Sequence, residues 1–214
     1  MWKWTLNSNP IRDDLVIGSC PMTTGDIDVI RAQTGATALL SLQSDACRAV
    51  FGIDYQTHRA YGEQNERAMV NAPMLDFDPP DQRRNLPHAV HSLRDLLAAD
   101  HKVSLHCTAG CNRAPLTALG YLTFVEMLVP DAAIAFIRAA RPEAEPSWEA
   151  YDGCRQDLVE MMREHITMRA YYLSQEYPGY GPDAHWVRAE SEMIRDAFVT
   201  GNWPARFRLD PSRE

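Results

Sequence analysis

Residues 103–115 read VSLHCTAGCNRAP, and this stretch decides the fold. Its first part, Val103 to His106, is typical of a short buried strand. A loop from Cys107 to Arg113 follows. Pro115 comes where a helix can begin, because its fixed φ and missing N–H cost nothing in the first helical turn. The stretch therefore predicts a strand, a tight loop and a helix N-terminus in direct succession.

The segments around this stretch alternate between strand and helix patterns. Strand patterns occupy residues 15–18, 38–42 and 70–75, in addition to 103–106. Helical patterns occupy residues 24–35, 87–97, 115–128, 131–138 and 148–162. Pro73 suits an edge strand or a strand end, since proline cannot donate a ladder hydrogen bond. The alternation predicts an α/β fold, with a central, mostly parallel sheet flanked by helices.

The C-terminal part of the chain has a different character, because no strand pattern occurs after residue 163. Helices are expected at residues 165–175 and 184–199, with a turn-rich cluster between them. We therefore divide the chain into a main domain, residues 1–162, and a helical C-terminal extension, residues 163–214.

The composition is that of a soluble globular protein, with 45% hydrophobic and 23% charged residues over 214 positions. The net charge of −8 disfavours nucleic acid as a partner, because a phosphate backbone is bound by basic surfaces. No apolar run reaches the ~18 residues of a membrane-spanning helix, so no membrane partner is expected. The first residues lack the apolar core of a secretory signal, and we expect a cytoplasmic protein.

The cysteines do not form a recognisable framework. They are odd in number, with no CxxC pair, at Cys20, Cys47, Cys107, Cys111 and Cys154. This pattern argues against a secreted disulfide scaffold and against a structural zinc site. We predict no metal and no cofactor.

The loop that begins at Cys107 combines three features that suit a phosphate group. A tight loop at a helix N-terminus supplies several N–H donors, and Gly110 lets the backbone turn closely. Arg113 offers a planar fork that matches two phosphate oxygens. The same donors and the guanidinium favour the thiolate form of Cys107, which is the nucleophilic form. The remaining predicted phosphate-binding residues are Thr108, Ala109, Cys111 and Asn112.

Breaking a phosphate ester also needs a general acid on a second loop. The turn-rich stretch 76–81 offers Asp76, Asp78 and Asp81. Aspartate also favours turns for purely structural reasons. The residues alone do not choose among the three.

Residues 106–115 resemble the loop of the dual-specificity phosphatases, a cysteine-dependent family, and are most similar to the glucan (starch) phosphatases of plants. The similarity also covers residues 11–20, 40–45, 51–54 and 76–78, and extends over roughly residues 7–160. It implies the cysteine phosphatase fold and hydrolysis through a phosphocysteine. By this resemblance Asp76, which begins an Asp-Phe-Asp run, is the acid, and Phe77 contacts the glucan chain. The alternative for Phe77 is packing under the loop.

Three positions are informative in view of that resemblance. Ala114 follows the loop arginine, as in the plant enzymes, where many dual-specificity phosphatases have Ser or Thr. Ser41 stands where the redox-regulated plant enzyme has a cysteine, so that disulfide switch is expected to be absent. Cys111 is interpreted as a packed thiol, with a Cys107–Cys111 disulfide as the alternative.

The substrate stays open at this stage among phosphoglucan, phosphoprotein and small phosphates such as inositol phosphates. Phe77, Tyr61, Trp148 and Tyr151 are candidates for an aromatic rim that would stack on sugars or on a phosphotyrosine. The other functional classes considered are a phosphate-binding module without turnover, an arsenate reductase and a rhodanese-like sulfur carrier.

The extension has a resemblance of its own. Residues 166–171 and 183–190 resemble a short bacterial helical domain of unknown function, which suggests a bacterial source. Trp203 and Phe207 are predicted to dock the end of the chain on the main domain.

Overall fold

The computed structural model describes residues 3–201 and 203. Its centre is a five-stranded sheet in the order β1-β2-β5-β3-β4. Strands β2, β5, β3 and β4 are parallel, and β1 joins the edge in the antiparallel direction. The strands are β1 (Ser8–Arg12), β2 (Leu15–Gly18), β3 (Ala38–Gln43), β4 (Ala68–Met74) and β5 (Val103–His106). The predicted α/β fold with a mostly parallel sheet is confirmed.

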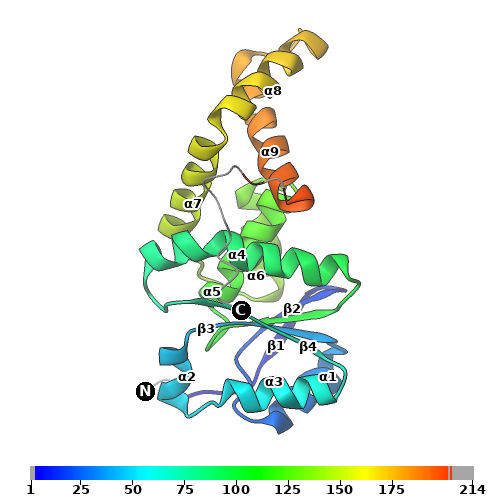
Figure 1. The fold of residues 1–214 in the computed structure, drawn as a ribbon, viewed down its shortest axis with the longest axis vertical. Helices are drawn as coiled ribbons and strands as arrows, with labels where there is room; N and C mark the ends of the chain where they lie inside the picture. Colours follow the sequence, from blue (N-terminus) through cyan, green and yellow to red (C-terminus); the bar gives the residue numbers. More distant parts are fainter. Residues whose placement is uncertain (1–2, 202, 204–214) are drawn as a thin grey trace.

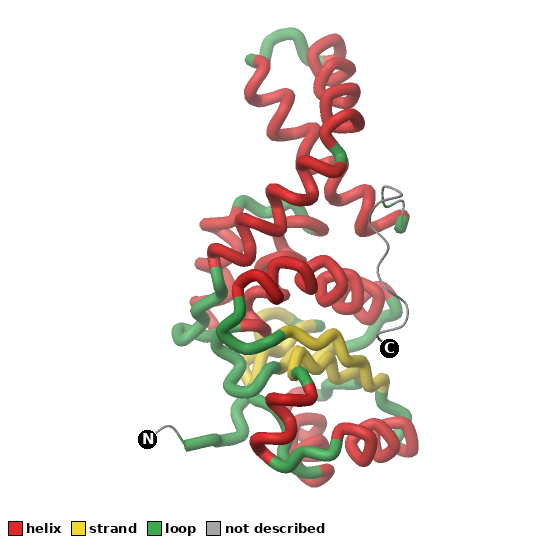
Figure 2. Tube along the Cα trace, turned by 60° about the vertical axis from the view of Figure 1, so that its left-hand side comes forward, coloured by secondary structure: helices red, strands yellow, loops and turns green. Residues whose placement is uncertain are grey.

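Helices enclose the sheet on both faces (Figure 2). On one side lie α1 (Thr24–Thr34), α2 (Asp45–Phe51) and α3 (Tyr55–Gln64). On the other lie α4 (Pro79–Ala98), α5 (Arg113–Gly120), the π-helical turn η1 (Tyr121–Val125) and α6 (Pro130–Ala140). Beyond this second layer come α7 (Trp148–Met161), α8 (Arg163–Glu176) and α9 (Pro182–Thr200), and the α8–α9 hairpin projects away from the sheet (Figure 1).

The sheet order places the loop after β5 at the centre of the molecule. Strand β5 lies between β2 and β3, and its last residue, His106, pairs with Gly18 on one side and Ser41 on the other. Parallel strands end at the same edge of a sheet, and in open α/β folds that edge carries the binding crevice. The residues that follow β3, β4 and β5 are therefore brought together.

Two predicted helix limits were wrong. The helix expected from Pro87 begins at Pro79, because Asp78 caps it and the prolines at 79 and 80 suit its first turn. Pro87 lies buried inside that helix. The helix expected at 115–128 is α5 followed by the π-helical η1. The other predicted strands and helices are confirmed. Pro73 lies on the edge strand β4, as expected. The sequence did not predict β1, α2 or α3.

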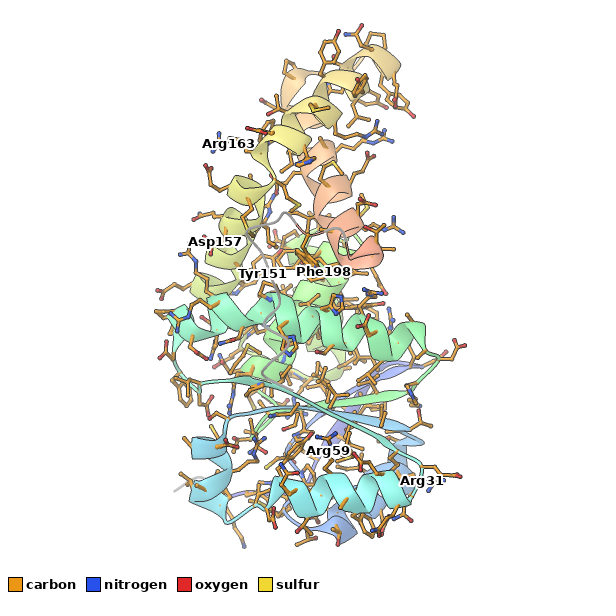
Figure 3. The ribbon with its side chains drawn as sticks, viewed as in Figure 1. Arg31, Arg59, Tyr151, Asp157, Arg163 and Phe198 are labelled. Atoms are coloured by element: carbon orange, nitrogen blue, oxygen red, sulfur yellow. The ribbon has the colours of Figure 1, made fainter. Side chains whose placement is uncertain are left out.

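The C-terminal helices share apolar contacts with the main body. Phe198 of α9 stacks on Phe124 of η1, with ring centroids 5.9 Å apart, and Tyr151 of α7 stacks on the same ring at 5.4 Å. Figure 3 shows Tyr151 and Phe198 in the space between their two helices. Trp203 packs edge-on against Phe198 at 4.7 Å, and Phe207 lies outside the described residues. Within the described ranges, no helix is both long and apolar enough to cross a membrane.

Candidate active site

Cys107 is the first residue after β5, and its side chain is buried at the floor of the loop. The backbone N–H of Gly110 points at the Cys107 sulfur, with the nitrogen 3.2 Å from Sγ. Gly110 has φ +75°, and a Cβ there would lie 2.5 Å from the carbonyl oxygen of Gly18. The turn that aims this N–H at the thiol therefore requires glycine.

The carbonyl groups of the loop are bonded from outside. The N–H of Cys20 donates to the carbonyl of Thr108, and the N–H of Glu145 donates to that of Cys111. The carbonyls of Ala109 and Gly110 accept from Arg141. A trans peptide directs its C=O and N–H in opposite directions. Carbonyls that face outward leave the N–H groups of residues 109–112 facing the interior of the loop.

Arg113 is fully buried, and one edge of its guanidinium is fixed by the sheet. Its Nη1 donates to the carbonyls of Met74, at 3.0 Å, and of Leu42, at 3.4 Å, where β4 and β3 end. Its Nη2 donates to the hydroxyl of Thr108 at 3.0 Å. Among the residues that the structure describes, Nε has no acceptor. Nε is thus the guanidinium donor left for an anion. A bidentate contact along the Nε–Nη2 edge would also have to take Nη2 from Asp76, whose Oδ2 lies 3.0 Å from it.

Charges around the loop hold Arg113 in its cationic form. Burial alone would lower the pKa of Arg113, but the nearby Cys107, Asp76 and Cys47 raise it above its ordinary value. The same cation acts on Cys47, whose Sγ lies 3.3 Å from Nη1. Burial would raise the pKa of Cys47, and the Ser44 hydrogen bond and the charge of Arg113 outweigh it, so the pKa falls.

His106, directly before the nucleophile candidate, is a neutral core residue. Complete burial lowers its pKa to about 3. It therefore adds no positive charge to the loop near neutral pH.

The acid loop, residues 75–78, sorts the three predicted aspartates. Asp76 Oδ2 lies 3.0 Å from Nη2 of Arg113, and its side chain is 31% exposed. Asp78 instead caps α4 by accepting the N–H of Asp81. Asp81 accepts the N–H of Leu75 at 2.7 Å and so anchors the base of the loop. Of these three aspartates, Asp76 is the one that contacts Arg113.

The predicted aromatic rim separates into two groups. Phe77 is 85% exposed with φ +53°, so it stands out beside the loop and does not pack under it. Trp148 is half-buried at the start of α7, three residues after Glu145, which bonds the loop. Both stay rim candidates.

The other two rim predictions were wrong. Tyr151 is 1% exposed, because its ring packs between Phe124 and Trp148 in the core. Tyr61 donates its hydroxyl to Asp28 and lies near the guanidinium of Arg67. Arg67 comes directly before β4, so these contacts are at the edge of the sheet opposite to the loop.

The remaining loop side chains have structural contacts. Thr108 accepts from Arg113 and from Gln43 at the end of β3. Asn112 donates to the carbonyl of Glu145. The Cys111 thiol contacts the carbonyl of Ala109, and burial raises its pKa. All five cysteines are free thiols, with no Cys107–Cys111 disulfide.

Sequence reasoning missed Gln82, a fully buried side chain that joins the two loops. Its Nε2 donates to the carbonyl of Leu75, at 3.1 Å, and to Asn112 Oδ1, at 3.0 Å. Gln82 follows the same face of α4 as the buried Leu86, Val90 and Leu93. A helix predicted from Pro79 would have shown a polar residue on that apolar face, which was the available signal.

No group of three or more His, Cys, Asp or Glu side chains in the described part of the chain is placed to hold a metal ion. No protein-family model matches the chain.

Two curated relatives are plant proteins. The chain is 30% identical over 163 residues to phosphoglucan phosphatase DSP4, amyloplastic, of Castanea sativa, an alignment that covers 75% of this chain and 43% of DSP4. It is also 30% identical over 195 residues to phosphoglucan phosphatase LSF1, chloroplastic, of Arabidopsis thaliana, covering 90% of this chain and 31% of LSF1. The chain therefore spans less than half the length of these two relatives.

Among solved structures, PTPMT1 has a similar fold. The TM-score is 0.58 at 16% identity, with 77% of this chain and 99% of that chain covered. PTPMT1 has also been crystallised in complex with PI(5)P, and that structure gives a TM-score of 0.56. The fold is thus shared with solved phosphatases such as PTPMT1, and the two plant relatives are named as phosphoglucan phosphatases.

Proposed function

We propose that this chain, a homologue of the plant phosphoglucan phosphatases with the fold of the dual-specificity phosphatases, hydrolyses phosphomonoesters through a phosphocysteine at Cys107. One observation carries the proposal. The buried Arg113 has a guanidinium edge whose Nε has no acceptor in the described chain, beside a loop whose carbonyls are bonded outward. Nε and the loop N–H groups are therefore in place before a phosphate dianion binds.

The first step forms a sulfur–phosphorus bond. The Arg113 edge and the loop N–H groups hold the dianion, and the Cys107 thiolate attacks phosphorus opposite the ester oxygen. The phosphorus–oxygen bond breaks, and Asp76 gives its proton to the leaving oxygen. The support for Asp76 in this role is that its Oδ2 lies 3.0 Å from Nη2 of Arg113.

The second step returns the enzyme to its starting state. A water molecule attacks phosphorus, and the phosphorus–sulfur bond breaks to leave the Cys107 thiolate. Asp76, now a carboxylate, accepts a proton from that water. Inorganic phosphate leaves. The loop N–H groups and Arg113 supply the positive field throughout, so the steps need no metal ion.

The test is a phosphatase assay on para-nitrophenyl phosphate in the presence of a chelator. The full chain is expected to turn over, and Cys107→Ser is expected to lose activity to background. Turnover by Cys107→Ser equal to that of the wild type would exclude the phosphocysteine route. Tight phosphate binding without turnover by the wild type would instead favour a non-catalytic binding module.

For the substrate, we propose a phosphorylated glucan. The two relatives named as phosphoglucan phosphatases support this class, and the exposed Phe77 offers a ring on which a sugar face can stack. Phosphate release is to be compared among phosphorylated glucan, a phosphotyrosine peptide and an inositol phosphate, the last being related to the PI(5)P bound by PTPMT1. A higher kcat/KM on either of the latter two would exclude glucan as the preferred substrate.

The cytoplasmic location, the bacterial source, the division at residues 162 and 163, and the resemblance of the extension stay predictions. The two plant relatives are named as amyloplastic and chloroplastic proteins.

A further inference from the structure

Arg141 lies at the end of α6 and has no part in the chemistry described above, yet its side chain is fully buried. Its Nη2 lies 3.3 Å from Glu143, whose own side chain is half-exposed. A buried charge is costly unless its donors are satisfied. Here all five N–H donors of the guanidinium have neutral acceptors. They are the carbonyls of Gly110, Ala109 and Ile17 and the side-chain oxygens of Asn7 and Asn9.

The two shortest of the carbonyl contacts go to the phosphate loop. Nε donates to the carbonyl of Gly110 at 2.7 Å, and Nη2 donates to that of Ala109 at 2.8 Å. Hydrogen bonds from a charged donor are stronger than those between neutral groups. The fit is close, since a Cβ on Gly110 would lie 2.8 Å from Nη2 of Arg141.

These contacts fix the direction of the N–H groups on the other side of the same peptides. The carbonyl of Ala109 belongs to the peptide whose N–H is that of Gly110, and this N–H points at Cys107 Sγ. The carbonyl of Gly110 belongs to the peptide whose N–H is that of Cys111. One guanidinium outside the loop therefore sets two of the donors inside it.

We propose that Arg141 is a positioning residue, which aims the N–H groups of Gly110 and Cys111 at the thiolate and at the bound phosphate. The proposal rests on the proposed function in one respect, that this loop binds phosphate. Asn7 and Asn9, on the N-terminal segment, hold the far side of the guanidinium and so support it indirectly.

The test measures the thiol itself, without turnover. The full chain is treated with iodoacetate, and alkylation of the Cys107 peptide is followed by mass spectrometry against pH and against inorganic phosphate. Arg141→Lys keeps the charge but cannot hold two carbonyls with a planar fork. We expect the phosphate concentration that halves the alkylation rate to rise ~10- to 100-fold, and the pH midpoint of alkylation to move upward.

The control is Arg67→Lys. Arg67 is another buried arginine, and it contacts Asp28 at the opposite edge of the sheet. This variant is expected to lower the melting temperature without moving either midpoint. If Arg141→Lys also changes only the melting temperature, the proposal is wrong. Should Arg141→Lys fail to fold, the Asn7→Ala/Asn9→Ala double variant takes its place, and an unchanged phosphate midpoint in it overturns the proposal.

The two proposals fail differently. Suppose that the wild type binds phosphate at Cys107 without hydrolysing para-nitrophenyl phosphate, and that Arg141→Lys loses this binding. This result would exclude the proposed function and support the role of Arg141. If the wild type is active and Arg141→Lys changes neither the phosphate midpoint nor the pH midpoint of alkylation, the role of Arg141 is excluded and the proposed function is supported.

Discussion

The phosphate loop, residues 107–113, and the acid loop, residues 75–78, face each other across Arg113 and are built in opposite ways. The phosphate loop is mostly buried, and its carbonyls are bonded by Cys20, Arg141 and Glu145, far apart in the chain. The acid loop carries the exposed Phe77 and is held at Leu75 by Asp81 and Gln82. Stabilising a charge requires donors fixed in advance, whereas a proton donor needs only to reach the leaving oxygen.

The largest expected effect comes from replacing Arg113, whose guanidinium lies in the buried phosphate loop. Arg113→Lys keeps the positive charge but loses the planar pair of donors along the Nε–Nη2 edge. We expect kcat/KM on an aryl phosphate to fall ~1000-fold, in the upper part of the range for lost transition-state donors. Arg84→Lys, at an exposed position on α4, is the control and should retain wild-type activity. A loss smaller than ~10-fold for Arg113→Lys would contradict the assignment of that edge to the phosphate.

The next effect belongs to the acid loop and depends on the substrate. Asp76→Asn should lower kcat ~100-fold on a sugar phosphate, because an alkoxide needs a proton to leave. The loss should be smaller on para-nitrophenyl phosphate, whose leaving group departs more readily unaided. Activity should be bell-shaped in pH, and the variant should lose the dependence of the alkaline limb on that acid. Pairs of pH–rate profiles on the two substrates measure both effects.

Equal losses on the two substrates would show that Asp76 is not the acid. Asp78 and Asp81 would be tested next, in that order. Because Asp78 caps α4 and Asp81 binds the N–H of Leu75, their variants need a stability measurement beside the kinetics.

A third prediction concerns His106, which is buried directly before the phosphate loop, and its effect on stability at acid pH. The pKa of His106 is about 3 in the folded protein, below the ordinary value of 6.5. Between these two pKa values His106 binds a proton in the unfolded chain but not in the folded one. The contribution of neutral His106 to the free energy of unfolding is therefore present above pH 6.5 and is lost as the pH falls toward 3. His106 should cost the fold ~2 kcal/mol between pH 6.5 and pH 5. Urea unfolding at both pH values measures this.

The control for that measurement is His106→Gln, which removes the titration. Its free energy of unfolding should change less over the same interval. An equal acid-induced loss in the variant would place the effect at other groups.

The smallest expected effect is at the exposed ring of the acid loop. Phe77→Ala should raise KM for phosphorylated glucan a few-fold, about the worth of one aromatic contact, and leave turnover of para-nitrophenyl phosphate unchanged. Tyr180→Ala is a matched control, since Tyr180 is an exposed aromatic residue between α8 and α9. A similar loss on both substrates would assign Phe77 to the placement of Asp76 instead of to sugar binding.

Local sequence determined the strand, loop and helix of residues 103–115, and with them the positions of Cys107 and Arg113. These features depend on contacts within a few residues, such as the positive φ of Gly110 and the early proline of α5. Family resemblance pointed to Asp76 as the acid, and this assignment stays a prediction; in the structure Asp76 contacts Arg113. The sequence alone also placed most of the other strands and helices.

Tertiary structure alone decided which distant residues meet at the loop. Tyr151 and Tyr61 matched an aromatic rim by residue type, but one lies in the core and the other at the opposite edge of the sheet. Residue spacing could show Gln82 as a polar residue on an apolar helix face, but it could not show that Gln82 contacts Asn112 or that Arg141 contacts Gly110. The physical reason is that such contacts depend on strand order and on how helices pack across the sheet, which residue spacing along the chain does not specify.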